Sequence, residues 1–173
     1  NWLQQLFYPR PFQADLEAAI QGTSVPDWLM WAMVRTESNF DQGAQSGPGA
    51  RGLAQLMPST AVMVARNLKI SENDLYEPAV NLKLGSTYLA DQFKAFGKWP
   101  QALAAYNAGA GRVKGWIRSG LSDDPVLFTE FIPFEETRNY VRRIVESSLL
   151  YNRLYGSLEP TCLLDLVMQK ANP

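Results

Sequence analysis

Glu37 is the residue of this sequence whose type and position best suit acid–base chemistry. It lies in the stretch VRTESNFDQGAQSGPGARGLAQLMPSTA, residues 34–61, at the end of an apolar helical run. On a helix it shares a face with Met33 and Val34. Apolar surroundings disfavour the charged form of a carboxyl group and raise its pKa, so the group can hold a proton at neutral pH and act as a general acid. The alternative is a solvated residue of the last turn, as most charged helix residues are.

The composition excludes several other chemistries. The chain has no histidine and one cysteine, Cys162, which excludes Ser-His-Asp and Cys-His catalysis, histidine-ligated zinc and an internal disulfide. Cys162 is interpreted as an ordinary apolar residue. The formal net charge of −1 indicates neither nucleic acid nor an acidic membrane surface as a partner. No run of 18 apolar residues is present, so no transmembrane helix is predicted. We expect no metal site and no cofactor.

The segment after Glu37 is rich in glycine. The motif SGPGARG, residues 46–52, has three glycines and a proline within seven residues. Such a loop lets the backbone approach a ligand closely, although an ordinary tight turn is the alternative. Gln55 and Met57 follow it, spaced so that both can face one side of an extended segment. An amide and a thioether beside a glycine-rich loop suit a sugar. Asp41, the acidic residue next in sequence to Glu37, is expected to hold the loop instead of acting chemically.

Helical periodicity predicts the elements that carry these residues. No alternating strand pattern extends beyond about four residues, so we expect one mainly α domain spanning 1–173, with at most a small β-hairpin between Ala44 and Gln55. One long helix is predicted from Pro78 to Phe96, ending at Gly97. The remaining helical segments are 11–22, 25–39, 57–68, 99–111, 111–120, 123–131, a stretch that opens at Pro133 and closes at Gly156, and a last one at 158–168.

Four motifs occur in a characteristic order: ESNF, SGPGARGLAQLMPSTA, AAYNAGAGRV and PFEETRNYVRRI. Together they resemble the soluble lytic murein transglycosylases, whose catalytic domain is lysozyme-like, over about residues 8–156. The sequence FYPRPF near the start is similar to the point where this domain follows a helical one. The resemblance therefore implies a longer parent chain with an N-terminal α-superhelical region.

The resemblance implies a function and a set of site residues. Members of this family cleave the β-1,4 bond between N-acetylmuramic acid and N-acetylglucosamine in peptidoglycan and form a 1,6-anhydro-muramyl end without consuming water. Glu37 matches their catalytic acid. The implied partner is the peptidoglycan glycan strand, which places the protein in the periplasm, at the cell wall or the outer membrane. The residues that match substrate contacts are Ser46, Gln55, Met57, Tyr106, Asn107, Glu136 and Tyr140. Ala54 departs from the family pattern, which has methionine there.

A single acid suffices if the substrate supplies the second group. Ordinary glycosidases use two carboxyl groups, but the acetamido oxygen of the sugar can act as the nucleophile. Glu37 would then serve first as acid and later as base. Two alternatives stay open from the sequence: a hydrolytic lysozyme with the same acid, and a peptidoglycan-binding module without catalytic activity.

Overall fold

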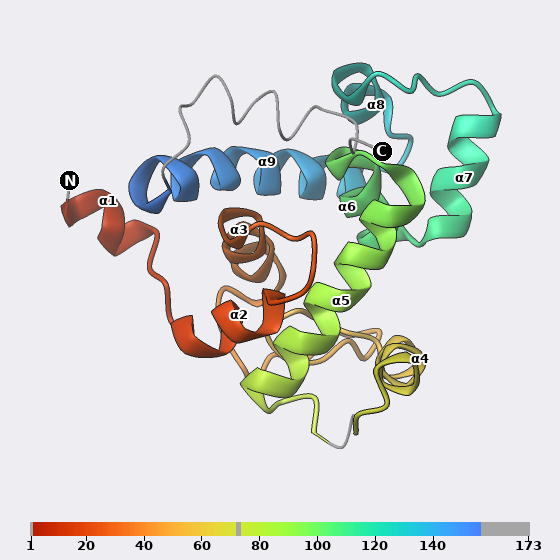
Figure 1. The fold of residues 1–173 in the computed structure, drawn as a ribbon. Helices are drawn as coiled ribbons and strands as arrows, with labels where there is room; N and C mark the ends of the chain where they lie inside the picture. The colour runs from red at the N-terminus through yellow and green to blue at the C-terminus, as the bar shows by residue number, and fades with distance from the viewer. Residues whose placement is uncertain (1, 72–73, 157–173) are drawn as a thin grey trace. The chain divides into compact units, whose positions relative to one another are not determined.

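The regular secondary structure is α-helical in the described residues, 2–71 and 74–156, of the computed structural model (Figure 1). This agrees with the predicted mainly α class. The chain divides into two compact units, residues 1–88 and 89–173, and the boundary falls within α5. The helices are α1 (Trp2–Phe7), α2 (Gln13–Ile20), α3 (Asp27–Ser38), α4 (Pro58–Leu68), α5 (Pro78–Phe96), α6 (Trp99–Ala108), α7 (Ala110–Arg118), α8 (Pro125–Phe131) and α9 (Glu135–Tyr155).

Several helix boundaries follow from local signals. Helix α5 has the predicted bounds, and Gly97, with φ of +72°, ends it. The predicted start of the last long helix at Pro133 is wrong, because α9 begins at Glu135. Phe134 has an extended backbone, and its ring packs edge-on against Trp116 with centroids 5.3 Å apart. Helix α1 was not predicted. The predicted helix at 158–168 and Cys162 lie outside the described residues.

The first unit has α3 at its core. Residues 28–34 of this helix, the sequence WLMWAMV, are all buried, so the helix is apolar on every side and not merely on one stripe. Helix α2 packs against it. The last turn of α2 is capped from α5, where Lys83 Nζ donates to the carbonyl oxygens of Ala19 and Gln21 at 3.1 and 3.2 Å. These contacts satisfy carbonyl groups that a helix end leaves without partners.

In the second unit α6 is the central helix. It is buried over most of its length and packs against α7, α8 and α9, and α8 also packs against α9. The loop between α7 and α8 is held to the start of α6: buried Lys98 contacts the carbonyl and the carboxylate of Asp123. Asp124 then caps α8, because its Oδ1 accepts from the backbone N–H groups of Val126 and Leu127 at 3.0 Å each.

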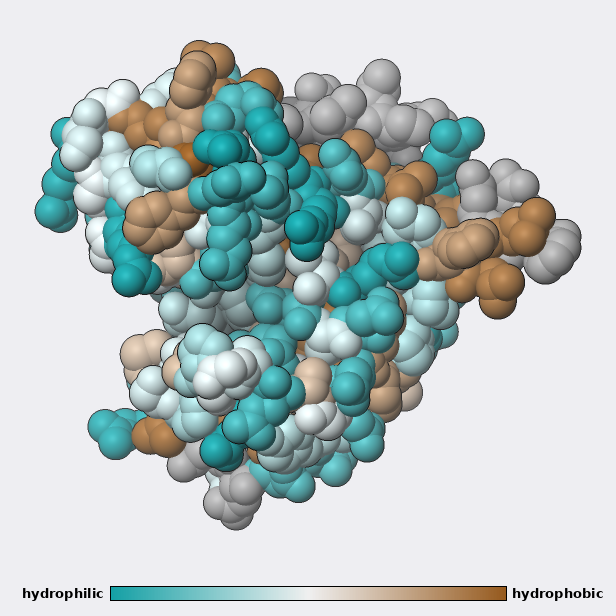
Figure 2. All heavy atoms as spheres, turned by 180° about the vertical axis from the view of Figure 1, so that it is seen from behind, coloured by the Kyte–Doolittle hydropathy of each residue, from teal (hydrophilic) through white to brown (hydrophobic). Residues whose placement is uncertain are grey.

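The glycine-rich segment forms no strands. It contains two isolated antiparallel bridges, Gln45 with Arg51 and Arg51 with Leu56, in the region where at most a small hairpin was predicted. Among the described residues, no helix is both long enough and apolar enough to cross a membrane. Some apolar side chains are nevertheless exposed on α1, namely Leu3, Leu6 and Phe7, and contribute to the hydrophobic surface coloured brown in Figure 2.

Candidate active site

Glu37 lies in the last turn of α3, at the surface end of a buried helix. Its neighbours on the same helix face, Met33 and Val34, are essentially inaccessible to solvent, and Glu37 itself is half-buried. The side chains of Thr36 and Ser38 donate to carbonyl oxygens one turn back in the helix, at 2.9 and 3.3 Å. Glu37 therefore lies at the end of a helix face whose preceding apolar residues are buried, as its sequence position predicted.

The backbone turns sharply after Ser38, where α3 ends. Asn39 and Phe40 both have positive φ, of 50° and 66°, which is unusual for a bulky residue such as phenylalanine. The Phe40 ring packs against Trp31 of α3, with centroids 6.0 Å apart. This contact holds the strained turn in place. Asp41 follows, and its Oδ1 accepts from the N–H of Gly43 at 2.8 Å. The prediction that Asp41 has a loop-holding role is confirmed.

Ser46 closes a tight turn in the glycine-rich loop. Its Oγ accepts from the N–H of Ala50 at 2.9 Å, and its own N–H donates to the Ala50 carbonyl at 3.0 Å. The Ser46 carbonyl accepts from Gly49, which has a φ of +98°. The hydroxyl hydrogen of Ser46 can still be donated, since a hydroxyl both accepts and donates.

The prediction that Gln55 and Met57 share an extended segment is wrong. Gln55 lies in a turn with a φ of +46°, because its side-chain amide bonds back into the loop. Its Nε2 donates to the carbonyl oxygens of Ala44 and Gly52, at 3.1 and 2.9 Å. Gln55 therefore braces the loop with its nitrogen, while its Oε1 accepts no hydrogen bond from residues 2–71 or 74–156. Met57 precedes α4 in an extended conformation and is 40% exposed.

In the second unit the structure ties Asn107 to α9. Asn107 lies at the end of α6 and is exposed, and its Oδ1 accepts from the hydroxyl of Thr137 at 2.7 Å. Thr137 is buried and follows Glu136 directly. The AYNAG and ETR motifs, 30 residues apart, therefore meet at this hydrogen bond. No role was predicted for Thr137, although it lies within the ETR motif.

The other predicted residues of this unit lie on the same two helices. Tyr106 is half-buried near the end of α6, Glu136 is exposed in the first turn of α9, and Tyr140 lies one turn later and is 7% exposed. The predicted site residues are thus divided between the units. Glu37, Ser46, Gln55 and Met57 belong to the first, and Tyr106, Asn107, Glu136 and Tyr140 to the second.

Residues not predicted as functional hold the start of α9. Arg138 Nη1 donates to the carbonyl of Ile132 at 2.9 Å and so fixes the turn before the helix. The Phe134 ring packs against Trp116 and lies under the Arg112 guanidinium, 5.7 Å from the ring centroid. These contacts orient the ETR segment. Their sequence signal was present, because Phe134 and Arg138 belong to the motif PFEETRNYVRRI.

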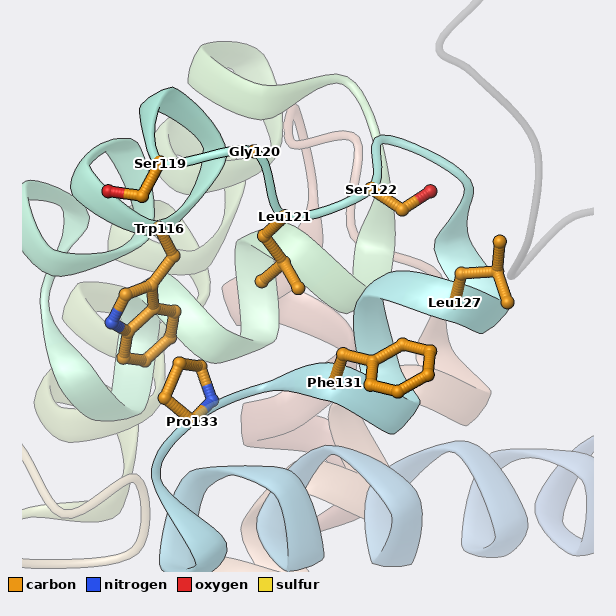
Figure 3. A pocket seen from close by; sticks show the side chains of 8 residues that line it. All are labelled: Trp116, Ser119, Gly120, Leu121, Ser122, Leu127, Phe131 and Pro133. Atoms are coloured by element: carbon orange, nitrogen blue, oxygen red, sulfur yellow. The ribbon is translucent and has the colours of Figure 1, made fainter.

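A cavity of about 480 Å³ opens between α7, α8 and the segment before α9 (Figure 3). Its walls are mostly apolar: Trp116 and Pro133 lie at one side, Phe131 at the other, and Leu121 between them. None of the predicted site residues lines it. The complete lining is Trp116, Ser119, Gly120, Leu121, Ser122, Leu127, Phe131 and Pro133.

Comparison with known proteins identifies the family. Residues 16–125 match the family model of the transglycosylase SLT domain. The chain belongs to this family. This chain is 33% identical over 162 residues to the soluble lytic murein transglycosylase of Escherichia coli. The matched region covers 90% of this chain and 25% of that protein. The chain is 35% identical over 145 residues to the enzyme of the same name from Salmonella typhimurium, covering 80% of this chain and 22% of the relative.

Solved structures agree with this assignment. The 70 kDa soluble lytic transglycosylase of Escherichia coli superposes with a TM-score of 0.88 at 31% identity, covering 96% of this chain and 28% of that one. An inactive glutamate-to-glutamine mutant of the lytic transglycosylase Slt from Pseudomonas aeruginosa superposes with a TM-score of 0.84 at 34% identity. This match covers 90% of this chain and 26% of that one. The predicted family and lysozyme-like fold class are confirmed. The SLT chain spans about a quarter of the length of these relatives.

Proposed function

We propose that this SLT domain is a lytic transglycosylase that cleaves the β-1,4 bond between N-acetylmuramic acid and N-acetylglucosamine in peptidoglycan and leaves a 1,6-anhydro-muramyl end. The observation that carries the proposal is the position of Glu37, a half-buried carboxyl group at the end of a helix in which residues 28–34 are buried. Membership of the transglycosylase SLT family supports it.

In the first step Glu37 acts as a general acid. Its proton goes to the glycosidic oxygen as the bond from that oxygen to muramyl C1 breaks, and N-acetylglucosamine leaves as an alcohol. The muramyl acetamido oxygen attacks C1 from the opposite face and gives an oxazolinium ion. The substrate therefore supplies the nucleophile that a second carboxylate supplies in most retaining glycosidases.

In the second step the ionised Glu37 acts as a base. It removes the proton from the C6 hydroxyl of the same muramyl residue, and that oxygen attacks C1 as the acetamido oxygen departs. The acetamide is restored, the 1,6-anhydro ring closes, and Glu37 recovers its proton. No water is consumed, and the same residue serves both steps, as microscopic reversibility requires.

Each unit carries further residues that would contact the glycan. In the first, the Ser46 hydroxyl can donate to a sugar oxygen and Gln55 Oε1 can accept, since the Gln55 nitrogen is already bonded within the loop. The exposed Met57 thioether offers apolar contact to a sugar ring.

In the second unit, Asn107 is oriented by Thr137 and can donate from its amide nitrogen. Glu136 is exposed and can accept from sugar hydroxyls near the product ring. Tyr106 and Tyr140 would add contacts from this unit, each with an apolar ring and a hydroxyl group.

The glycan substrate implies a location and a larger assembly. We propose that the protein works in the periplasm, at the cell wall or outer membrane, and that a longer parent chain carries an N-terminal α-superhelical region. The small share of each relative that this chain covers supports a further region.

Mass spectrometry of the products from purified sacculi tests the proposal. The chain should release muropeptides with anhydro ends, each lighter by one water than a hydrolytic product. Glu37→Gln should lose this activity by at least about a hundredfold, since general acid–base catalysis contributes roughly that much or more. Asp41→Asn is the matched control, because it removes the charge of the adjacent acid, whose role is to hold the loop.

Three results would contradict the proposal. Hydrated products would make the enzyme a hydrolytic lysozyme. A wild-type chain that binds glycan without cutting it would be a binding module. Full activity in Glu37→Gln would remove Glu37 from the mechanism.

A further inference from the structure

Asn81 of α5 is fully buried and bonds to the glycine-rich loop far from it in sequence. Its Oδ1 accepts from the N–H of Ala54, 27 residues away, at 2.7 Å. Its Nδ2 donates to the carbonyl oxygens of Arg51 and Leu75, at 2.9 and 2.8 Å. An asparagine amide supplies two donors and an acceptor, and here all three functions are used on backbone groups.

Gly52 allows the loop to come this close to Asn81. The residue has a φ of +73°, and a Cβ atom there would lie 2.1 Å from the Leu75 carbonyl oxygen and 2.4 Å from Asn81 Nδ2. No side chain can occupy such a position without displacing backbone. The loop backbone therefore rests directly on the Asn81 amide, and both ends of the turn around Gly52 are fixed by it.

The Asn81 contacts extend to the proposed substrate contacts through the loop's own hydrogen bonds. The N–H of Gly52 donates to the Ala44 carbonyl at 2.9 Å, and Gln55 Nε2 donates to the same carbonyl and to that of Gly52. Arg51 pairs with Leu56 directly before Met57. Asn81 thus bonds to the backbone of segment 44–57, the segment that carries these contacts.

We infer that Asn81 is a positioning residue for the transglycosylase reaction. It holds loop 44–57 in the conformation that presents Ser46, Gln55 and Met57 to the glycan, and it does not touch the sugar because it is fully buried. This inference rests on the proposed function. Loss of the Asn81 hydrogen bonds lets the loop move, and small displacements of positioning groups lower rates strongly.

Two substitutions of Asn81 test this role. Asn81→Asp keeps the shape and the acceptor for Ala54 but places an oxygen against the carbonyl groups of Arg51 and Leu75, where two donors are needed. Asn81→Ser removes the amide without adding a charge and serves if Asn81→Asp does not fold.

Ser86→Ala is the matched control. Ser86 is also fully buried on α5, but its Oγ donates to the carbonyl oxygen of Ala19 at 2.9 Å, so it holds α2 and not the loop.

The assay compares kcat and KM on purified glycan strands, together with hydrogen exchange of the amides in 44–57, at a temperature where each variant is folded. Asn81 variants should show faster exchange at Ala54 and a kcat/KM roughly tenfold or more below wild type. Ser86→Ala should keep the wild-type kcat/KM and the wild-type exchange rate at Ala54.

The outcomes separate this inference from the proposed function. A wild-type chain that forms no anhydro product refutes both. An active wild type, with Asn81→Ser matching Ser86→Ala in kcat/KM and in exchange of the loop amides, refutes the positioning role alone.

Discussion

Three glycines of the loop between α3 and α4 make it possible to separate backbone strain from steric contact. An alanine Cβ at Gly47 would meet no atom within 4 Å, and its backbone is not in the left-handed region. Gly49 also has free space, but its φ is +98°. Gly52 has a φ of +73° and the contact of 2.1 Å with the Leu75 carbonyl described above. An alanine therefore introduces neither strain nor a clash at Gly47, backbone strain alone at Gly49, and both strain and a clash at Gly52.

The expected loss of folding stability increases from Gly47→Ala through Gly49→Ala to Gly52→Ala. Gly47→Ala should leave stability unchanged or raise it by up to about 1 kcal/mol, because alanine restricts the unfolded chain. Gly49→Ala adds left-handed strain, which costs about 1–2 kcal/mol. Gly52→Ala adds a clash with backbone, and overpacking costs a further ~1–3 kcal/mol. Its total is about 2–5 kcal/mol, or roughly 4–20 °C in Tm at ~2–4 °C per kcal/mol for a chain of this size.

Urea and thermal unfolding followed by circular dichroism measure the series. The decisive quantity is the difference between Gly52→Ala and Gly49→Ala, which isolates the clash from the strain. If the two variants agree within about 0.5 kcal/mol, a typical limit for neutral changes, the close packing of the loop against Leu75 and Asn81 is refuted.

Three further changes have defined outcomes. Glu37→Gln should abolish anhydro-product formation by at least about a hundredfold while the circular dichroism spectrum stays that of wild type, and a lost spectrum would contradict a purely chemical role. Asp124→Ala should lower the unfolding free energy by about 1 kcal/mol because it removes the cap of α8, and Asp124→Asn should restore most of it, as denaturant titration can show. Arg142→Met should cost less than about 1 kcal/mol and less still in high salt, because Arg142 and its partner Glu130 are 40% and 49% exposed; a larger, salt-independent loss would contradict a surface pair.

Local sequence signals were sufficient to predict the features that depend on residues within about one turn of each other. Pro78 and Gly97 defined α5, because proline is favoured at a helix start and glycine accepts the left-handed conformation after its end. Asp41 was expected to hold the loop because it follows the end of a helix, where aspartate side chains bond to nearby backbone, and its Oδ1 accepts from the N–H of Gly43. The apolar run before Glu37 predicted its half-buried position. These features depend on residues within four positions of one another.

The same signals misplaced residues whose conformation depends on distant contacts. Gln55 was predicted to be extended, but its side chain bonds to Ala44, 11 residues earlier, and the backbone takes a left-handed turn. The last long helix starts at Glu135 and not at Pro133, because Phe134 packs on Trp116. No local pattern encodes either contact.

The sequence by itself determined the helical class and the family, and it predicted Glu37 as the acid, because periodicity and ordered motifs are properties of the chain alone. The tertiary structure decided how the loop is held. Asn81 gave no sign of its role, since an asparagine in a helix is ordinarily a surface residue. Only the folded chain brings its amide to Arg51, Ala54 and Leu75, because buried backbone groups must find partners wherever packing places them.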